Sequence, residues 1–322
     1  MTEYSKYIDS LLTPKIHEEA VVLDLFAGCG GLSLGFEAAG FRTIGYEMVE
    51  SAADTYNKNL AGKCYKQFLE VGFEYPQMDK IDIVVGGPPC QPFSRFGSQK
   101  GIEDARDGFP IFIDAVKRIQ PKVFLFENVA NIIGRHKWYF DMIVGKLRKL
   151  GYIVDYKVLN AVNYGVPQNR ERLICVGHRA KFSYPEAIVN KTTVENAIGD
   201  LMCLSDENSK FLTPEQDRYI ASYEAKSHCV TPRDLHPDRP ARTITCRNLA
   251  GATSDMQRVK LPDGRRRRVE VREAARLQSF PDWFEFCGTE TRKFYQIGNA
   301  VPPLLAYKTC HGNKEDLSLC PC

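Results

Sequence analysis

Short apolar runs separated by glycine-rich or polar turns mark the first half of this chain. The run at residues 21–26 enters a glycine-rich turn, residues 32–39 place apolar side chains at helical spacing, and the run at 43–46 ends at Glu47. This order predicts a strand, a helix and a second strand. We therefore expect a βαβ unit at the start of the fold.

The same alternation continues along the chain. Further strands are expected at 81–85, 123–126 and 172–176, and helices are expected near 109–119 and 138–150. Strands that alternate with helices form mostly parallel sheets covered on both faces. The pattern thus predicts an α/β fold, while residues 1–19 are polar and are expected to be irregular.

A second region begins where this alternation stops. The stretch is polar and is interrupted by Pro214, Pro232, Pro237 and Pro240. A short helix is expected at 271–277, and residues 295–305 are apolar again. We assign residues 20–180 together with 290–310 to one domain and residues 181–289 to a smaller second domain.

The composition restricts the possible class of protein. The chain has 322 residues, of which 43% are hydrophobic, so it can bury a full core. With 43 Lys and Arg against 40 Asp and Glu, its formal net charge of +3 is too balanced to indicate nucleic-acid binding, and any basic surface must be local. The eleven cysteines are scattered without zinc-type spacing, so no metal site is expected. No leader or apolar run of membrane length is present, which favours a reducing cytoplasm with free thiols.

A candidate ligand loop follows the first strand. Gly28, Gly30 and Gly31 lie between a strand and a helix, where backbone amides can approach a ligand. Glu47, at the end of the second strand, suits a bidentate contact with ribose hydroxyls. The simpler alternative is a tight turn beside a solvated glutamate.

Cys90 is the candidate nucleophile. It lies in Gly-Gly-Pro-Pro-Cys-Gln-Pro-Phe-Ser, residues 86–94, directly after a strand and therefore at the carboxyl edge of the predicted sheet. A lone cysteine is ordinarily a buried small hydrophobe, but the flanking prolines and glycines favour a stiff exposed turn. A thiol is mostly protonated at neutral pH and needs cationic help, for which Arg170 and Arg172 are candidates.

Glu127 is the candidate acid. It ends the strand after Cys90, so its carboxylate is expected at the same edge of the sheet, where it can move a proton or bond a ring nitrogen. The alternative is an acid that stabilises a helix N-terminus. Arg170 and Arg172 occupy alternate positions of an extended segment and are expected to face the same way.

Six segments in this order resemble the motifs of the bacterial DNA (cytosine-5)-methyltransferases over most of residues 21–305. The matching segments are residues 24–31, 86–94, 127–129, 168–172, 272–278 and 296–303. The resemblance implies a Rossmann-like S-adenosylmethionine-dependent methyltransferase with a target-recognition domain at 181–289. It further implies a role in a restriction-modification system.

The same resemblance implies roles for the residues. Cys90 would add to carbon-6 of a flipped-out cytosine, Glu127 would contact or protonate N3, Arg172 would hold the base carbonyl, and Arg170 would organise the site. Flipping the base costs a few kcal/mol, which DNA contacts must offset. The positions expected to line the cofactor pocket are Phe26, Gly28, Gly30, Glu47, Met48, Pro89, Asn299 and Val301.

DNA contacts are expected from two regions. A closing loop at residues 94–101 would offer Ser94, Arg95 and Ser98 to phosphates, although a merely mobile surface loop is the alternative. In the target-recognition region, polar side chains suited to bases or phosphates are Arg233, His236, Arg239, Arg242, Arg247 and Asn248. The basic run at 265–268, with Arg265 and Arg266, is expected to contact the DNA backbone, a solvated hairpin being the alternative.

Some features depart from the family pattern. The acid that usually follows the third strand and binds the adenine amino group is undecided among Glu70, Glu74 and Asp79. Met48 stands where an aromatic ring often stacks on adenine. The tail beyond Leu305 does not have the pattern of an amphipathic helix.

Three rival functions remain to be weighed. A transfer-RNA cytosine methyltransferase has the same fold, but the arginine-rich variable region favours duplex DNA. An inactive DNA-binding relative would not need Cys90 beside Glu127, and a nicotinamide dehydrogenase leaves Cys90 unexplained. The partners expected are double-stranded DNA and, in a restriction-modification system, a cognate endonuclease, with the enzyme acting as a monomer. The recognition sequence is left open.

Overall fold

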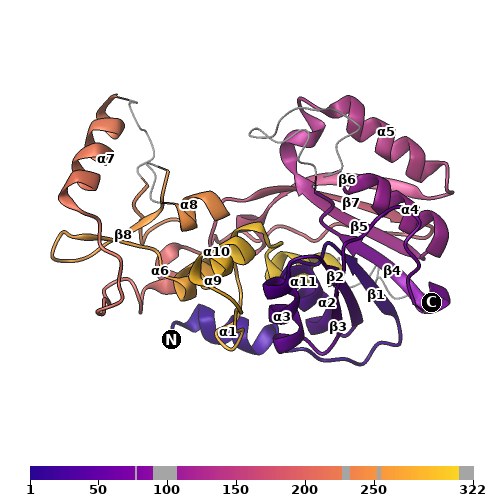
Figure 1. Cartoon of the computed structure of the whole chain (residues 1–322), viewed down its shortest axis with the longest axis horizontal. Coiled ribbons are helices and arrows are strands. Elements are labelled where there is room, and N and C mark those ends of the chain that lie inside the picture. The colour runs from indigo at the N-terminus through magenta and orange to yellow at the C-terminus, as the bar shows by residue number, and fades with distance from the viewer. Residues whose placement is uncertain (77, 90–106, 227–232, 252–254, 312–322) are drawn as a thin grey trace.

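A seven-stranded sheet forms the centre of the molecule (Figure 1). The computed structural model describes residues 1–76, 78–89, 107–226, 233–251 and 255–311. The strand order is β3-β2-β1-β4-β5-β7-β6. The strands are β1 (Val21–Leu25), β2 (Arg42–Glu47), β3 (Lys63–Lys66), β4 (Ile81–Gly86), β5 (Val123–Val129), β6 (Ile153–Asn160) and β7 (Glu171–His178). Only β7 runs antiparallel to its neighbours, so the predicted, mostly parallel sheet is confirmed.

Strand β1 is apolar apart from Asp24 because both of its faces are covered. Val22 points to one hydrophobic cluster, and Leu23 and Leu25 point to another on the opposite face. Helices α2 (Gly31–Ala38) and α11 (Pro303–His311) cover the first face. Helices α4 (Phe109–Ile119) and α5 (Lys137–Arg148) cover the second. A parallel strand covered on both faces carries a nearly continuous apolar run, which is the pattern that predicted this strand.

The remaining elements form a second lobe and its junction with the sheet. Two short strands pair antiparallel, and helix α3 packs beside β2 and β3. These elements are α3 (Glu50–Asn59), α6 (Val194–Ile198), α7 (Pro214–Lys226), α8 (Cys246–Ala250), β8 (Arg258–Lys260), β9 (Arg266–Arg268), α9 (Val271–Leu277) and α10 (Glu290–Asn299). Among the residues described, short 3₁₀ helices are η1 (Met78–Lys80), η4 (Ala130–Ile133) and η5 (Ala161–Tyr164). The helix expected at 271–277 is confirmed.

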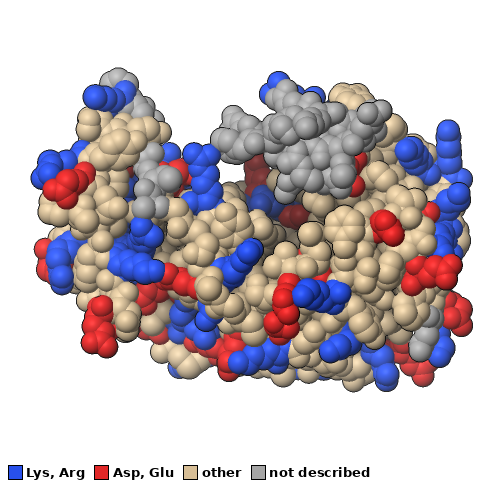
Figure 2. Space-filling view, in the orientation of Figure 1, with Lys and Arg blue, Asp and Glu red and all other residues tan. Residues whose placement is uncertain are grey.

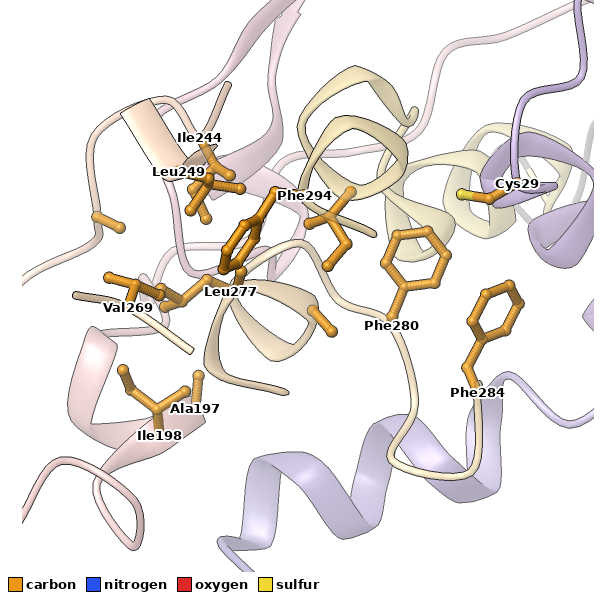
Figure 3. Packing of buried hydrophobic residues seen from close by; sticks show 14 of the residues in the cluster. Cys29, Ala197, Ile198, Ile244, Leu249, Val269, Leu277, Phe280, Phe284 and Phe294 are labelled. Atoms are coloured by element: carbon orange, nitrogen blue, oxygen red, sulfur yellow. The ribbon is translucent and has the colours of Figure 1, made fainter. Parts of the chain in front are cut away.

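One hydrophobic cluster joins the two lobes. Figure 3 shows Leu277, Phe280 and Phe294 packed between Cys29, which follows β1, and Ile198 of α6. Since this cluster contains side chains from both predicted domains, the core continues across their boundary. The division into 20–180 with 290–310 and 181–289 stays a prediction.

The expectation of an irregular N-terminus is wrong. Residues Glu3–Leu11 form helix α1, which Thr2 caps by accepting a hydrogen bond from the Ser5 amide. The few apolar residues of this segment fall on one side of the helix, and Ile8 and Leu12 are almost fully buried. The helix therefore depends on tertiary packing more than on its own sequence.

Strands β3 and β6 and helix α11 are among the elements that were not expected from the sequence. Strands β3 and β6 lie at the two edges of the sheet, where exposed polar residues interrupt the apolar pattern. Helix α11 extends past Leu305 to His311, within the stretch in which no amphipathic pattern was expected. Its turns are buried nearly all round, so it shows no amphipathic pattern. Among the residues described, no helix has both the length and the apolar character needed to span a membrane.

We expect Leu12→Ala to lower the free energy of unfolding by about 2–5 kcal/mol, because it opens a cavity beneath α1. Urea denaturation monitored by circular dichroism measures this change. Ile16→Ala is the matched control, since Ile16 is 37% exposed and its truncation should change stability by less than about 0.5 kcal/mol. Equal stability of the two variants would contradict a role for α1 in holding the fold.

Candidate active site

A cavity of about 770 Å³ lies at the carboxyl ends of β1, β2, β4 and β5. Figure 2 shows the cleft between the two lobes, with acidic and basic side chains on its floor. Helix α10 supplies the facing wall through Arg292, Tyr295 and Asn299. The cavity thus lies where α/β sheets hold their ligands, and its volume is in the upper part of the range for small-molecule sites.

The turn after β1 leaves room for a ligand. Phe26 and Gly28 both have positive φ angles, 61° and 56°, and both line the cavity. A Cβ at Gly28 would meet no heavy atom within 4 Å, so the backbone there is open to the cavity. Phe26 is not a glycine, and its left-handed conformation places strain at the cavity wall, as is common at functional sites.

Glu47 is held in position by this turn. One carboxylate oxygen accepts a hydrogen bond from the amide of Gly28 at 2.9 Å, and the other accepts one from the amide of Val49 at 2.7 Å. Each oxygen keeps further acceptor capacity. The carboxylate is therefore pre-oriented at the cavity and suited to vicinal hydroxyl donors.

Gly30 differs from the other predicted cofactor residues because it is not part of the cavity lining. Its φ angle is 87°, and a Cβ there would lie 2.8 Å from the ring of Tyr56. Gly30 is thus needed for the turn and for close packing against α3. We expect no direct ligand contact from its Cα.

Asp24 is a buried acid at the end of β1 that also lines the cavity. One carboxyl oxygen accepts a hydrogen bond from the Ser33 hydroxyl at 2.6 Å, and the other is buried without a partner among the residues described. Desolvation raises the pKa of Asp24 to about 7. The sequence interpretation assigned no role to this residue.

The raised pKa of Asp24 makes stability depend on pH. The folded carboxyl keeps its proton to a higher pH than the unfolded chain does, so unfolding releases a proton and stability falls as the pH rises from about 4 to about 7. We expect wild type to lose about 2–3 kcal/mol between pH 5 and pH 8 relative to Asp24→Asn, which does not titrate. Urea titrations at both pH values measure the difference. The exposed Asp54→Asn should behave as wild type, and parallel profiles of wild type and Asp24→Asn would contradict the prediction.

Glu127 and Arg172 form an ion pair on the cavity floor. Arg172 Nε lies 2.7 Å from a carboxylate oxygen of Glu127, and both side chains are little exposed. The two residues come from the adjacent antiparallel strands β5 and β7, where Val129 is opposite Arg172. The next residue along β5, Asn128, donates a hydrogen bond from its side-chain amide to the carbonyl of Pro88 at 3.0 Å. This contact attaches the turn after β4 to the strand that carries Glu127.

Arg170 is buried beneath the same cavity. Its guanidinium donates to the carbonyls of Ile244 at 2.7 Å, Gly298 at 3.2 Å and Ala300 at 2.9 Å. Burial, together with the nearby Arg172, lowers the pKa of Arg170. Arg170 therefore joins the segment before β7 to two distant parts of the chain.

Two buried glutamines, Gln168 and Gln278, add further hydrogen bonds beside those of Arg170. The side-chain amide of Gln168 donates to the Leu277 carbonyl at 2.9 Å and to the side chain of Gln278, and its oxygen accepts from the Ile244 amide at 3.0 Å. Gln278 donates in turn to the Ala300 carbonyl at 2.7 Å. We call Gln168, Arg170 and Gln278 the buried polar network. It fastens the floor of the cavity to α9 and α10.

A family model for the C-5 cytosine-specific DNA methylases matches residues 21–312, which include every element of this site. The chain belongs to this family. It is accordingly a DNA cytosine methyltransferase, as its sequence motifs predicted.

Curated relatives agree with this assignment. The Type II methyltransferase M.AplI of Arthrospira platensis is 57% identical over 297 residues, a match that covers 92% of this chain and 86% of that protein. The Type II methyltransferase M.XorII of Xanthomonas oryzae pv. oryzae is 34% identical, with 88% of this chain and 82% of that protein covered.

Solved structures confirm the fold. A mutant of Spodoptera frugiperda DNMT2 aligns with a TM-score of 0.69 at 18% identity, covering 89% of this chain and 97% of that one. The Entamoeba histolytica methyltransferase EhMeth aligns with a TM-score of 0.68 at 16% identity, covering 92% and 98%. The Rossmann-like methyltransferase fold expected from the motifs is therefore confirmed.

The methylase motifs converge on one cavity. Glu127, Arg170 and Arg172 all line it, and Pro89 brings the chain to its edge. Cys90 lies outside the described residues, as do Ser94, Arg95 and Ser98. The predicted cofactor positions that line the cavity are Phe26, Gly28, Glu47, Met48, Pro89, Asn299 and Val301.

The run at 265–268 is less available than the sequence indicated. Arg267 is almost fully buried and pairs with Glu273 at 2.8 Å, so it is not available for the contact with the DNA backbone that was expected of the run. Arg266 is half-buried and pairs with Asp234 at 2.9 Å and with Asp217 at 3.3 Å. Arg265 is exposed and pairs with its neighbour Asp263 at 2.7 Å. Arg266 and Arg267 thus connect different segments of the second lobe.

The other residues predicted to contact DNA differ in their exposure and in their partners. Arg233 and Arg242 both approach Asp255, at 3.2 Å and 3.6 Å. Arg247 is exposed on α8. The side chain of Asn248 caps α8 together with Thr245 and is buried. This position does not fit the expected contact of Asn248 with a DNA base.

Proposed function

We propose that this methylase transfers a methyl group from S-adenosylmethionine to carbon-5 of a flipped-out cytosine in duplex DNA, with Cys90 as a transient covalent nucleophile. The observation that carries the proposal is the placement of the Glu127–Arg172 pair and the Gly28–Glu47 turn in one cavity. The Glu127–Arg172 pair would contact the cytosine base, and the Gly28–Glu47 turn would bind the cofactor.

The cavity has the chemistry that the cofactor requires. Glu47 offers oriented acceptors for the ribose hydroxyls, and the open backbone at Gly28 permits close approach. Asn299 and Val301 lie on the opposite wall. When bound, S-adenosylmethionine supplies an electrophilic methyl group.

Cys90 and Glu127 would act on opposite parts of the cytosine ring. The Cys90 thiolate forms a bond from Sγ to carbon-6, while Glu127 bonds or protonates N3, so that the electron pair of the 5,6 double bond becomes available at carbon-5. After carbon-5 has gained the methyl group, loss of its proton restores the double bond and releases the thiolate. Pro88 and Pro89, which lead directly to Cys90, line the cavity that also contains Glu127.

Arg172 would both orient the acid and bind the base. Its Nε holds one oxygen of Glu127 at 2.7 Å, while one guanidinium nitrogen donates to the Glu171 carbonyl. The cytosine carbonyl is the acceptor that the remaining donor capacity of this guanidinium suits. Both terminal nitrogens of the Arg170 guanidinium already donate to carbonyl groups of the protein. Arg170 would therefore act as a positioning residue and would not bind the base.

The setting we propose is a restriction-modification system. The second lobe would select the DNA sequence, the methylase would act as a monomer in the cytoplasm, and a cognate endonuclease would cut the same site when it is unmethylated. The names of the related Type II methyltransferases support this setting.

Labelled S-adenosylmethionine, supplied with plasmid DNA or with transfer RNA, tests the proposal. Bisulfite sequencing should find 5-methylcytosine at one short repeated motif of the plasmid. Label only in transfer RNA would replace the DNA substrate by RNA. No transfer to either would refute the proposed activity.

We expect Arg247→Ala to weaken DNA binding about tenfold and to reduce the slope of log affinity against log salt by about one, as for the loss of one phosphate contact. Fluorescence anisotropy over a salt series measures both quantities. Lys122→Ala is the control, because Lys122 pairs with Asp82 at the opposite edge of the sheet from the cavity. An unchanged slope in Arg247→Ala would remove Arg247 from the DNA interface.

A further inference from the structure

A short segment, residues 241–245, joins the cavity to the second lobe. The Ile244 carbonyl accepts a hydrogen bond from Arg170 at 2.7 Å, and Thr245 lines the cavity. Arg242 lies three residues before Thr245, a span of at most about 10 Å of chain. The Arg242 side chain therefore starts close to the cavity that we assign to the flipped cytosine.

Arg242 is contacted at both its backbone and its guanidinium by one stretch of chain. The side-chain amide of Gln257 donates to the Arg242 carbonyl at 3.4 Å and to the Thr243 carbonyl at 3.3 Å. Two positions earlier, a carboxylate oxygen of Asp255 lies 3.6 Å from Nη1 of Arg242. The segment that carries Asp255 and Gln257 thus restricts where the Arg242 side chain can lie.

Asp255 pairs with two arginines. The carboxylate oxygen that faces Arg242 also lies 3.2 Å from Nε of Arg233. The Arg233 side chain is 15% exposed, whereas that of Arg242 is 41% exposed. Arg242 is therefore the member of this cluster that a ligand can reach.

The guanidinium of Arg242 keeps one edge available. Nη1 is buried towards Asp255 and makes no hydrogen bond with the described residues. Within the same part of the chain, no protein group accepts a hydrogen bond from Nε or Nη2 of Arg242. These two nitrogens present parallel N–H donors, which suit two acceptors lying in one plane.

Duplex DNA offers two such pairs of acceptors. One pair is O6 and N7 of guanine in the major groove, and the other is two oxygens of a phosphate. The position of Asp255 favours the guanine, because its partly exposed carboxylate repels a phosphate, whereas the edge of the base carries no net charge. A guanidinium already paired with a carboxylate also has less charge to offer to a phosphate.

We propose that Arg242 reads a guanine of the recognition sequence and that Asp255 is the positioning residue for its guanidinium. The inference rests on the proposed function, which places the target cytosine in the adjacent cavity. Since about 10 Å corresponds to about three base-pair steps, the guanine is expected within a few base pairs of that cytosine. Arg233 supports Asp255 and makes no base contact.

Methylation of duplexes that carry the recognition sequence, or one base-pair change in it, tests the inference. Bisulfite sequencing of plasmid DNA treated with wild type first supplies the sequence. We expect wild type to lose about 10- to 100-fold in kcat/KM when the guanine read by Arg242 is replaced. Arg242→Met should accept all four base pairs at that position within about threefold and keep the wild-type preference elsewhere, because it removes the donors and keeps much of the side chain.

Two further variants separate a base contact from a phosphate contact. Arg242→Lys keeps the charge but not the two parallel donors, so it should lose the same preference while the salt dependence of DNA binding stays as in wild type. Asp255→Asn should lower the preference at that same position and at no other, although Arg242 is still present.

Arg265→Met and Asp263→Asn are the matched controls, because these residues form an exposed pair at 2.7 Å in the same lobe. Both should keep the preference at every position, and thermal melts establish that each variant is folded. A loss of affinity in Arg242→Met that is equal for all duplexes, or a changed preference at an A·T pair, would overturn the inference. If wild type methylates duplex DNA and Arg242→Met keeps its preference, only this inference fails, whereas a wild type that methylates no DNA refutes the proposed function.

Discussion

Replacing Glu127 by glutamine will slow methyl transfer by about 10²–10⁴-fold while leaving DNA affinity within about threefold of wild type. Glutamine keeps the size of the side chain but cannot give a proton to N3 of cytosine. It also removes the charge that pairs with Arg172 at 2.7 Å. Single-turnover rates at saturating DNA and S-adenosylmethionine measure the chemical step directly.

Two comparisons make this result specific. Glu171→Gln changes an exposed acid next to Arg172 and should retain the wild-type rate. Cys90→Ser should abolish methylation and leave DNA binding largely intact, because the hydroxyl is a far weaker nucleophile than a thiolate. A wild-type rate in Glu127→Gln would contradict the role of Glu127 at N3, and appreciable turnover by Cys90→Ser would contradict the covalent mechanism.

Replacing Arg170 by methionine will lower the free energy of unfolding by about 3–5 kcal/mol. Methionine fills much of the volume, but it leaves the buried carbonyls of Ile244, Gly298 and Ala300 without the donors that reach them at 2.7–3.2 Å. In a chain of this size the loss corresponds to a fall in melting temperature of roughly 6–10 °C. Scanning calorimetry measures it.

Arg172→Met is the matched control for this prediction. Arg172 lies two residues away in the chain, but its guanidinium pairs with Glu127 at the cavity, not with several buried carbonyls. We expect it to lose activity and to lower stability less than Arg170→Met does, because it leaves one carboxylate at the cavity, and not three buried carbonyl groups, without a partner. If Arg170→Met were as stable as wild type, the buried polar network would not be what fastens the cavity floor to α9 and α10.

The central strands and their covering helices were predictable because they are buried on both faces. Strand β1 and helices α4 and α5 show the apolar runs and helical spacing that such burial requires. Helix α1 and the edge strand β6 were not predictable in this way. Exposed and polar residues interrupt their apolar patterns, and each element is stable only against partners from elsewhere in the chain.

Some residues of the candidate site were likewise predictable from the sequence, and others were not. Glu47, Glu127 and Arg172 were identified because each lies at the end or start of a predicted strand, and parallel strands end at the same edge of a sheet. Gly30 and Arg267 matched their patterns equally well, but the structure places a tyrosine ring against the first and a buried glutamate against the second. No local pattern reveals such neighbours.

By itself, therefore, the sequence determined the methylase family, the order of the central elements and the chemical groups available for catalysis. These properties depend on residue type and on spacing over a few positions, which a single chain displays directly. Only the tertiary structure decided that carbonyl groups of the protein bind the Arg170 guanidinium and that Arg266 and Arg267 are paired with carboxylates. Burial and pairing depend on partners distant in the chain, such as Ala300 for Arg170, and these partners meet only once the chain has folded.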